Sequence, residues 1–153
     1  SVDSGNTVLA GLARDNGVQS QTHLLGVRND IPAINAALDV ATSSSAYGEG
    51  CCNALAEALG CGIPCVSTAV GDSPLLVGPA GKVVPPRHPQ DLAQAWSDLL
   101  ELQGEQRQAL RLSARRHIQD HFSMEAFTRR HEQVYASIQN GTQIPHFVKN
   151  ATI

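Results

Sequence analysis

The sequence predicts an α/β fold in which a parallel sheet is flanked by helices, followed by a helical C-terminal tail. Two observations carry this prediction. Up to residue 85, short apolar runs bounded by Gly, Pro or Ser alternate with segments of helical periodicity, which is typical of β-α-β units and a parallel sheet. From residue 88 the periodicity is only helical. We therefore expect the last helices to pack over the sheet.

The elements of the first half follow from apolar spacing and local punctuation. Gly17 is placed to cap a first helix at its C-terminal end, and Pro32 stands in the first turn of a second. A third helix presents Cys52, Leu55 and Leu59 on one face and ends at Gly60. Helices are expected at residues 7–16, 31–37 and 50–59, and strands at 22–26 and 38–42.

The second half is expected to complete the sheet and then become all helical. Strands are predicted at residues 64–68 and 81–85, and helices at 88–101, 105–121 and, after a Ser123 N-cap, 123–138. The side chains expected to face inward from these helices are Leu92, Ala95, Trp96, Leu99, Leu110, Ala114, Ile118, Phe127, His131, Val134 and Ile138. We therefore predict one domain over residues 1–139 and a loose tail over 140–153.

Composition excludes several functional classes. The 153 residues carry a net charge of −3 without a basic run, so nucleic acid is not an expected partner. No apolar stretch reaches the roughly 18 residues of a spanning helix. The four cysteines, which lie between residues 51 and 65, form no C-x-x-C pair. We interpret them as reduced, mostly buried residues of a cytoplasmic protein rather than zinc ligands.

The most informative segment is the loop and helix at residues 43–60. A Ser/Gly loop that follows a strand and enters a helix presents free backbone N–H groups and the positive end of the helix dipole, which together suit a phosphate. Two carboxylates flank this position: Glu49 stands just before the expected helix, and Glu57 lies eight residues on, roughly 12 Å along the helix axis. Carboxylates accept hydrogen bonds from vicinal hydroxyls, so a sugar–pyrophosphate–nucleoside fits this spacing. Alternatively, Glu49 only favours the helix dipole and Glu57 is a solvated residue.

The pattern Ser45-x-x-x-Glu49-Gly-x-x-Asn-x-x-x-Glu57-Ala, with Gly62-Ile-Pro-Cys-Val after it, resembles the C-terminal domain of retaining GT-B glycosyltransferases of family 4, the group 1 family. Further segments agree in order: residues 24–34, 39–45, Val70-Gly-Asp-Ser, Gly81-Lys-Val-Val-Pro-Pro and Phe122-Ser-Met-Glu. The resemblance covers about residues 5–138. It implies a Rossmann-like domain, the C-terminal half of a GT-B fold.

The resemblance also implies a role for each matched position. Glu49, the candidate catalytic residue, would hold hydroxyls of the donor sugar, and Glu57 would hold the ribose. Stabilisation of the departing diphosphate by helix N–H groups and basic side chains would then be the main catalytic contribution, with no essential metal or cofactor. The distal phosphate would lie on the backbone N–H groups of Gly50, Cys51, Cys52 and Asn53. The base would be bordered by Val27, Arg28 and Ile31.

Two departures from the family pattern shape the expectation. Cys51-Cys52 replaces an aromatic or aliphatic residue and its neighbour, which alters the packing over the sugar. The family's domain begins with a strand and a basic Gly-Arg…Lys-Gly loop, and an acceptor domain precedes it. We find no counterpart of these segments, so we expect a chain that lacks the first two strands and is nearly inactive alone.

The resulting hypothesis is the donor-binding part of an EC 2.4 hexosyl-type transferase. It would move a sugar from a nucleotide-diphosphate sugar to a glycan or lipid-linked acceptor in polysaccharide biosynthesis. We expect a cytoplasmic protein without an integral membrane segment, acting at the inner face of the membrane where the acceptor is lipid-linked. Two alternatives stay open: a nucleotide-sugar 2-epimerase on the same scaffold, and a non-catalytic nucleotide-binding or interaction module.

Overall fold

The computed structural model describes residues 2–145 and divides the chain into two compact units, residues 1–31 and 32–153. The first unit contains α1 (Thr7–Asp15) and a 3-10 turn, η1 (Gln19–Gln21). Asn6 caps α1, because its side-chain oxygen accepts a hydrogen bond from the Leu9 N–H. The strand predicted at 22–26 is wrong: its only pairing is one antiparallel bridge between Asp3 and Leu25. A strand needs a neighbour with matching length, and none is provided among residues 2–31.

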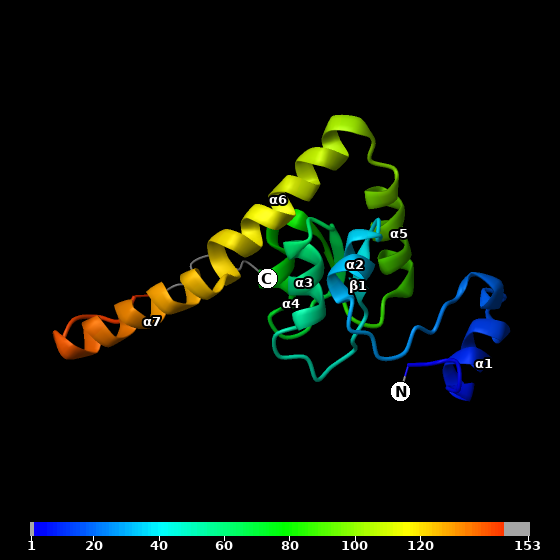
Figure 1. The fold of residues 1–153 in the computed structure, drawn as a ribbon, viewed down its shortest axis with the longest axis horizontal. Helices are drawn as coiled ribbons and strands as arrows, with labels where there is room; N and C mark the ends of the chain where they lie inside the picture. The colour runs from blue at the N-terminus through cyan, green and yellow to red at the C-terminus, as the bar shows by residue number, and fades with distance from the viewer. Residues whose placement is uncertain (1, 146–153) are drawn as a thin grey trace. The chain divides into compact units, whose positions relative to one another are not determined.

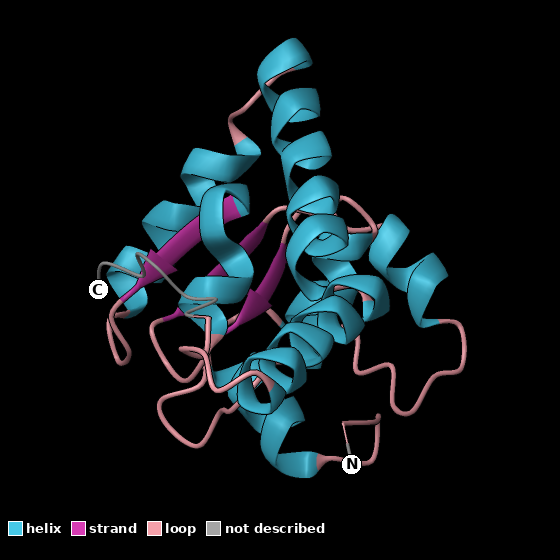
Figure 2. Ribbon diagram, turned by 90° about the vertical axis from the view of Figure 1, so that its left-hand side faces the viewer, coloured by secondary structure: helices cyan, strands magenta, loops and turns pink. Residues whose placement is uncertain are grey.

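The second unit is built on a parallel sheet of three strands in the order β1-β2-β3, with helices on both faces (Figures 1 and 2). The strands are β1 (Ala41–Ser43), β2 (Cys65–Thr68) and β3 (Gly81–Val84). The central strand, β2, is buried along its whole length, which explains its uninterrupted apolar and small sequence. The predicted parallel sheet is therefore confirmed for this unit. β1 is shorter than the predicted 38–42 run.

Alternate residues of β2 face two separate cores. Cys65 joins the core formed with α3 (Asn53–Gly60) and α4 (Ser73–Val77), whereas Val66 joins the core under α5 (Pro89–Leu100). The remaining short elements are α2 (Ile31–Ala36) and a 3-10 turn, η2 (Gly78–Ala80). Sequence periodicity did not predict α4, whose five residues are too few to show a helical repeat.

Two long helices follow. α6 (Gly104–Phe122) packs on α3, and its Ala114 is fully buried in the same core as Leu59. α7 (Met124–Gln139) begins at the predicted cap, since the Ser123 hydroxyl oxygen accepts a hydrogen bond from the Ala126 N–H. Of the predicted tail, residues 146–153 lie outside the described residues.

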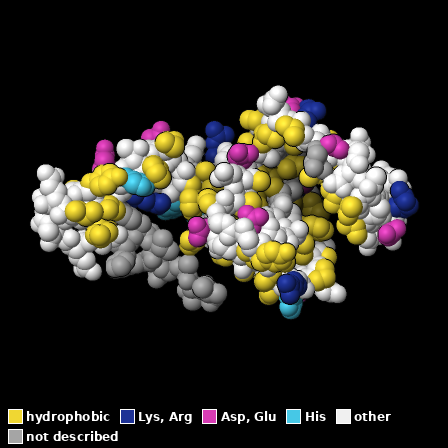
Figure 3. Space-filling view, turned by 90° about the horizontal axis from the view of Figure 1, so that it is seen from below, with side chains coloured by type: hydrophobic (Ala, Val, Ile, Leu, Met, Phe, Trp, Pro, Cys, Tyr) yellow, Lys and Arg dark blue, Asp and Glu magenta, His cyan; other side chains and the backbone are white. Residues whose placement is uncertain are grey.

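Some predicted inward side chains are on the surface. Trp96 of α5 is 40% exposed, and on α7 Phe127, His131 and Ile138 are all exposed. The buried residues of α7 are instead Ala126 and Ser137. Figure 3 shows hydrophobic side chains on the outer surface of α7. The spacing identified the apolar side of this helix correctly, but that side has no packing partner over most of its length in the described chain.

Candidate donor site

The candidate site lies where the carboxyl ends of β1 and β2 meet. The loop of residues 44–52 leaves β1 and enters α3, as predicted for an open parallel sheet (Figure 1). Glu49 is in this loop, four residues before the first residue of α3, Asn53. The helical rise of about 12 Å expected between the two glutamates therefore does not apply, because α3 begins at Asn53 and not directly after Glu49.

Glu49 is half-buried and held by its neighbours. The Ser45 hydroxyl donates a hydrogen bond of 2.6 Å to Oε1 of Glu49. The Ser45 carbonyl in turn accepts a hydrogen bond of 2.6 Å from Oγ1 of Thr68, the last residue of β2. One carboxylate oxygen of Glu49 thus has a fixed donor. Lone pairs on both oxygens stay available to the hydroxyls of a ligand.

The backbone after Glu49 offers a set of free donors. Within the described residues, the N–H groups of Gly50, Cys51, Cys52 and Asn53 make no hydrogen bond. Cys52 is the N-cap of α3, and its side chain does not cap the helix. These are the groups that a helix N-terminus presents to an anion, together with the positive end of the helix dipole.

The loop is supported from behind by the segment after β2. The Asp72 N–H donates a hydrogen bond of 2.9 Å to the Gly50 carbonyl. Gly71 has φ +57°, and a Cβ at this position would lie 2.3 Å from the carbonyl oxygen of Glu49 and 2.5 Å from that of Gly50. Only glycine permits this close approach of the two backbone segments.

Glu57 does not have the environment that its sequence neighbours suggested. A charge between Ala56 and Ala58 would need a partner if it were buried, but α3 turns its apolar side chains to the core and leaves Glu57 exposed. Within residues 2–145 its carboxylate has no hydrogen bond or ion pair. Exposure imposes no desolvation cost on the carboxylate, and it leaves both oxygens accessible to a ligand.

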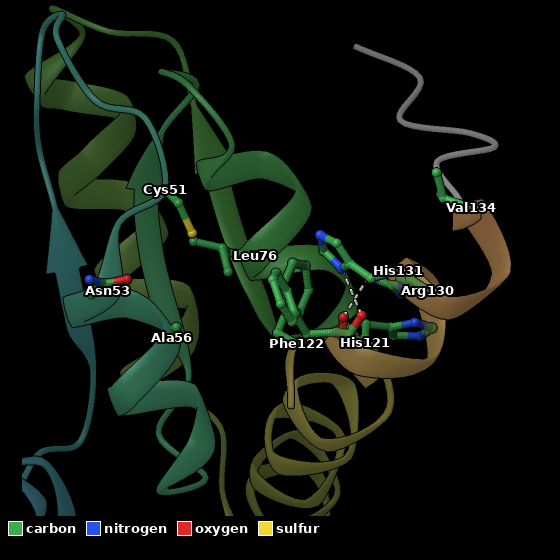
Figure 4. A pocket seen from close by; sticks show the side chains of 10 residues that line it. Cys51, Asn53, Ala56, Leu76, His121, Phe122, Arg130, His131 and Val134 are labelled. Carbon is green, nitrogen blue, oxygen red and sulfur yellow. Dashed lines mark hydrogen bonds between the residues drawn. The ribbon is translucent and has the colours of Figure 1, made fainter. Parts of the chain in front are cut away.

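A pocket of about 510 Å³ adjoins the free N–H groups (Figure 4). Cys51 and Leu76 line it on the side of α3 and α4, and Phe122, Arg130 and His131 line it from α6 and α7. Arg130 donates a hydrogen bond of 2.7 Å to the carbonyl of His121, and the His131 ring N–H donates one of 2.9 Å to the carbonyl of Phe127 (Figure 4). Sequence reasoning missed this group, since no motif joins Cys51 and Leu76 to residues of α6 and α7 that lie 45 or more positions further along the chain. His131, interpreted as a core histidine, is exposed.

The cysteines differ from the expectation of mostly buried residues. Only Cys65 is buried, Cys52 and Cys61 are intermediate, and Cys51 is exposed. All four are free thiols. Burial raises the pKa of the Cys65 thiol to about 12, because its surroundings disfavour the thiolate.

The three residues predicted to border the base belong to the N-terminal unit. Val27 is 92% exposed and Ile31 is 36% exposed. Arg28 forms an ion pair of 2.6 Å with Asp30, and this hydrogen bond raises the pKa of Arg28 and lowers that of Asp30. Their part in binding the base stays a prediction.

Two further features of residues 2–145 concern metals and membranes. No group of three or more His, Cys, Asp or Glu side chains is arranged to hold a metal ion. His117 and His121 have the i, i+4 spacing of a two-histidine metal site, but His117 donates a hydrogen bond of 2.9 Å from its Nε2 to the carbonyl of Leu75. No helix in this part of the chain has both the length and the apolar character needed to cross a bilayer.

Comparison with known proteins identifies the family and the fold of this chain. Residues 4–102 match the family described as Glycosyl transferases group 1. A solved structure, sucrose-phosphate synthase from Thermosynechococcus elongatus, superposes with a TM-score of 0.69 at 23% identity. That match covers 89% of this chain and 35% of the synthase chain, so this chain spans about a third of its relative's length. No curated protein sequence matches significantly. The chain is a member of the group 1 glycosyltransferase family and has the α/β architecture of a GT-B glycosyltransferase.

Proposed function

We propose that this chain is the donor-binding part of a retaining glycosyltransferase that moves a hexosyl group from a nucleotide-diphosphate sugar to a glycan or lipid-linked acceptor. The observation that carries the proposal is the arrangement at the entrance of α3. Four consecutive free N–H groups, of residues 50–53, directly follow a half-buried carboxylate, Glu49. A pyrophosphate and a sugar hydroxyl are the ligand groups that this pairing suits.

Each group has a defined task in the proposed reaction. Glu49 accepts hydrogen bonds from sugar hydroxyls and orients the sugar. The N–H groups stabilise the charge that develops on the diphosphate as the glycosidic bond breaks, which favours the transition state over the ground state. Glu57, exposed on α3, accepts hydrogen bonds from the ribose hydroxyls. Val27, Arg28 and Ile31 border the base.

The proposed reaction needs no essential metal from this chain. The leaving diphosphate is instead neutralised by helix N–H groups and by basic side chains, which in this family's pattern come from a Gly-Arg…Lys-Gly loop. With a lipid-linked acceptor, the reaction would take place at the cytoplasmic face of the membrane. This arrangement predicts that the 153-residue chain binds the donor weakly and transfers little sugar by itself.

Calorimetry on the gene product that carries this chain tests the proposal. UDP-, GDP- and ADP-sugars are titrated into the wild type and into Glu49→Gln and Glu57→Gln, which keep the side-chain shape and remove the charge. We expect Glu49→Gln to weaken binding of the nucleotide sugar but not of the free nucleoside diphosphate. Glu57→Gln should weaken binding of both. Glu125→Gln, a surface change on α7, is the control. Unchanged binding in both active-site variants would refute the site.

A further inference from the structure

We propose that Ser45 and Thr68 act as positioning residues, which hold the Glu49 carboxylate in the orientation that receives a hydroxyl of the donor sugar. This inference rests on the proposed function, because it concerns how Glu49 performs its part. It gives a role to Ser45, which opens the matched pattern four residues before Glu49, and it adds Thr68, which lies outside that pattern.

The structural basis is a chain of two short hydrogen bonds. Thr68 is 5% exposed at the end of β2, where its Oγ1 donates to the Ser45 carbonyl over 2.6 Å. The Ser45 hydroxyl donates to Oε1 of Glu49 over 2.6 Å. Such a length is typical of a hydroxyl bonded to a charged carboxylate, which is roughly twice as strong as a bond between neutral groups. The central strand of the sheet is thereby connected to the carboxylate.

The hydrogen bond from Ser45 limits both the conformation of Glu49 and the positions from which a ligand can reach it. Ser45 has a single O–H, and it is donated to Glu49. The bond restricts the side-chain rotations of Glu49, which would otherwise cost entropy when a ligand orders the carboxylate. It also occupies one site on Oε1, so sugar hydroxyls must use the remaining lone pairs. The bound sugar is thus given one preferred orientation relative to the N–H groups of α3.

Thr68 contributes in a different way from Ser45. Its hydroxyl bonds to a main-chain carbonyl, so it fixes the position of the loop and not the carboxylate itself. The backbone at this point is already anchored, because the Ala69 N–H donates to the Val84 carbonyl over 2.8 Å. Removal of the Thr68 hydroxyl should therefore shift Ser45 and Glu49 together, while the end of β2 stays in register with β3.

The experiment measures acceptor-free hydrolysis of the nucleotide sugar that calorimetry identifies as the donor. The gene product is compared as wild type, Ser45→Ala, Ser45→Thr, Glu49→Gln and the Ser45→Ala/Glu49→Gln double variant. We expect Ser45→Ala to lower kcat by about 10- to 100-fold, since misplacement by about 1 Å has effects of this size. Ser45→Thr restores the hydroxyl and should recover most of the rate. Binding of the free nucleoside diphosphate should be unchanged.

The double variant separates positioning from a purely structural role. If Ser45 acts through Glu49, Ser45→Ala adds little to the loss caused by Glu49→Gln, whereas independent effects multiply. Thr68→Val, with Thr68→Ser as its hydroxyl-retaining partner, tests the same chain of bonds should Ser45→Ala fold poorly. A kcat loss that follows only the folded fraction in both pairs would overturn the inference.

The two proposals fail in different ways. If Glu49→Gln is impaired while Ser45→Ala and Thr68→Val both hydrolyse the donor at the wild-type rate, the positioning inference alone is wrong. If Glu49→Gln hydrolyses and binds the nucleotide sugar like the wild type, the assigned role of Glu49 is wrong, and the inference falls with it.

Discussion

Replacement of Gly71 by alanine should disturb the loop that carries Glu49 more directly than any change within the loop. Gly71 has φ +57°, a conformation that costs an L-residue about 1–2 kcal/mol. Its new Cβ would lie 2.3 Å from the Glu49 carbonyl oxygen, where ordinary contact begins at 3.4 Å. The two backbone segments must therefore separate by about 1 Å, with an overpacking cost of about 1–3 kcal/mol. Together these effects lower the free energy of unfolding by about 2–5 kcal/mol.

Two glycines of the same loop provide matched controls. Gly48 has φ +81°, but a Cβ there meets nothing within 4 Å, so Gly48→Ala carries only the conformational cost. Gly50 has neither a positive φ nor a neighbour within 4 Å. Gly50→Ala should therefore unfold like the wild type. Urea unfolding of the three variants isolates the clash as the difference between Gly71→Ala and Gly48→Ala, about 1–3 kcal/mol.

Donor binding supplies the second measurement for Gly71→Ala. The clash is with the Glu49 and Gly50 carbonyls, so it displaces the loop that carries Glu49. We therefore expect Gly71→Ala to weaken binding of a nucleotide sugar more than binding of the free nucleoside diphosphate. Equal unfolding free energies for Gly71→Ala and Gly48→Ala would refute the reasoning. Such a result would mean that the loop moves away from β2 at no cost.

Three more predictions concern the scaffold. In Gly81→Ala the new Cβ would lie 1.8 Å from the Cys65 carbonyl oxygen, so the pairing of β2 with β3 should break. The variant should therefore lose its cooperative thermal transition. A melting temperature like that of the wild type would contradict this prediction. The pKa of Cys65 is raised from 9.0 to about 12 by burial, so the buried thiol stabilises the fold fully below pH 9 and loses this contribution as the pH rises to 12. Between pH 9 and 12 the unfolding free energy of the wild type should fall more steeply than that of Cys65→Ala, by up to about 1.4 kcal/mol per pH unit. Parallel curves of unfolding free energy against pH for the two proteins would contradict this prediction. Ser123→Ala removes the N-cap oxygen that accepts a hydrogen bond from the Ala126 N–H. It should lower the helical circular dichroism signal and reduce the unfolding free energy by about 1 kcal/mol. Ser123→Asp should restore both quantities.

The sequence predicted best those features that local chemistry determines. Ser123 caps α7 as its side-chain chemistry requires, and the apolar run at 65–68 is the buried central strand. Each of these depends on a few neighbouring residues. The strand predicted at 22–26 is wrong for the opposite reason, because an apolar run becomes a strand only where a neighbouring strand pairs with it, and pairing is not a local property.

Burial shows the same limit. The spacing on α7 defines an apolar side correctly, yet Phe127 and Ile138 are exposed, because periodicity does not tell whether a partner covers that side. At the site, Glu49 was identified from its motif. The bond from Thr68 to Ser45 was not predicted, since the two residues are 23 positions apart and only the parallel pairing of β1 with β2 brings them together.

The contacts of Glu49 indicate which part of the chain controls the site. The residues that hold its loop follow each other at the end of β2: Thr68 bonds to Ser45, Gly71 touches the Glu49 backbone, and Asp72 bonds to the adjacent carbonyl. α3 contributes the N–H groups but does not fix the carboxylate. Substitutions at residues 68–72 should therefore change discrimination between a nucleotide sugar and its nucleoside diphosphate, whereas exposed positions of α3 should affect the phosphate and ribose contacts alone. The position of the Glu49 loop, and with it the geometry of the proposed sugar site, thus depends on the end of β2 and the residues after it rather than on α3.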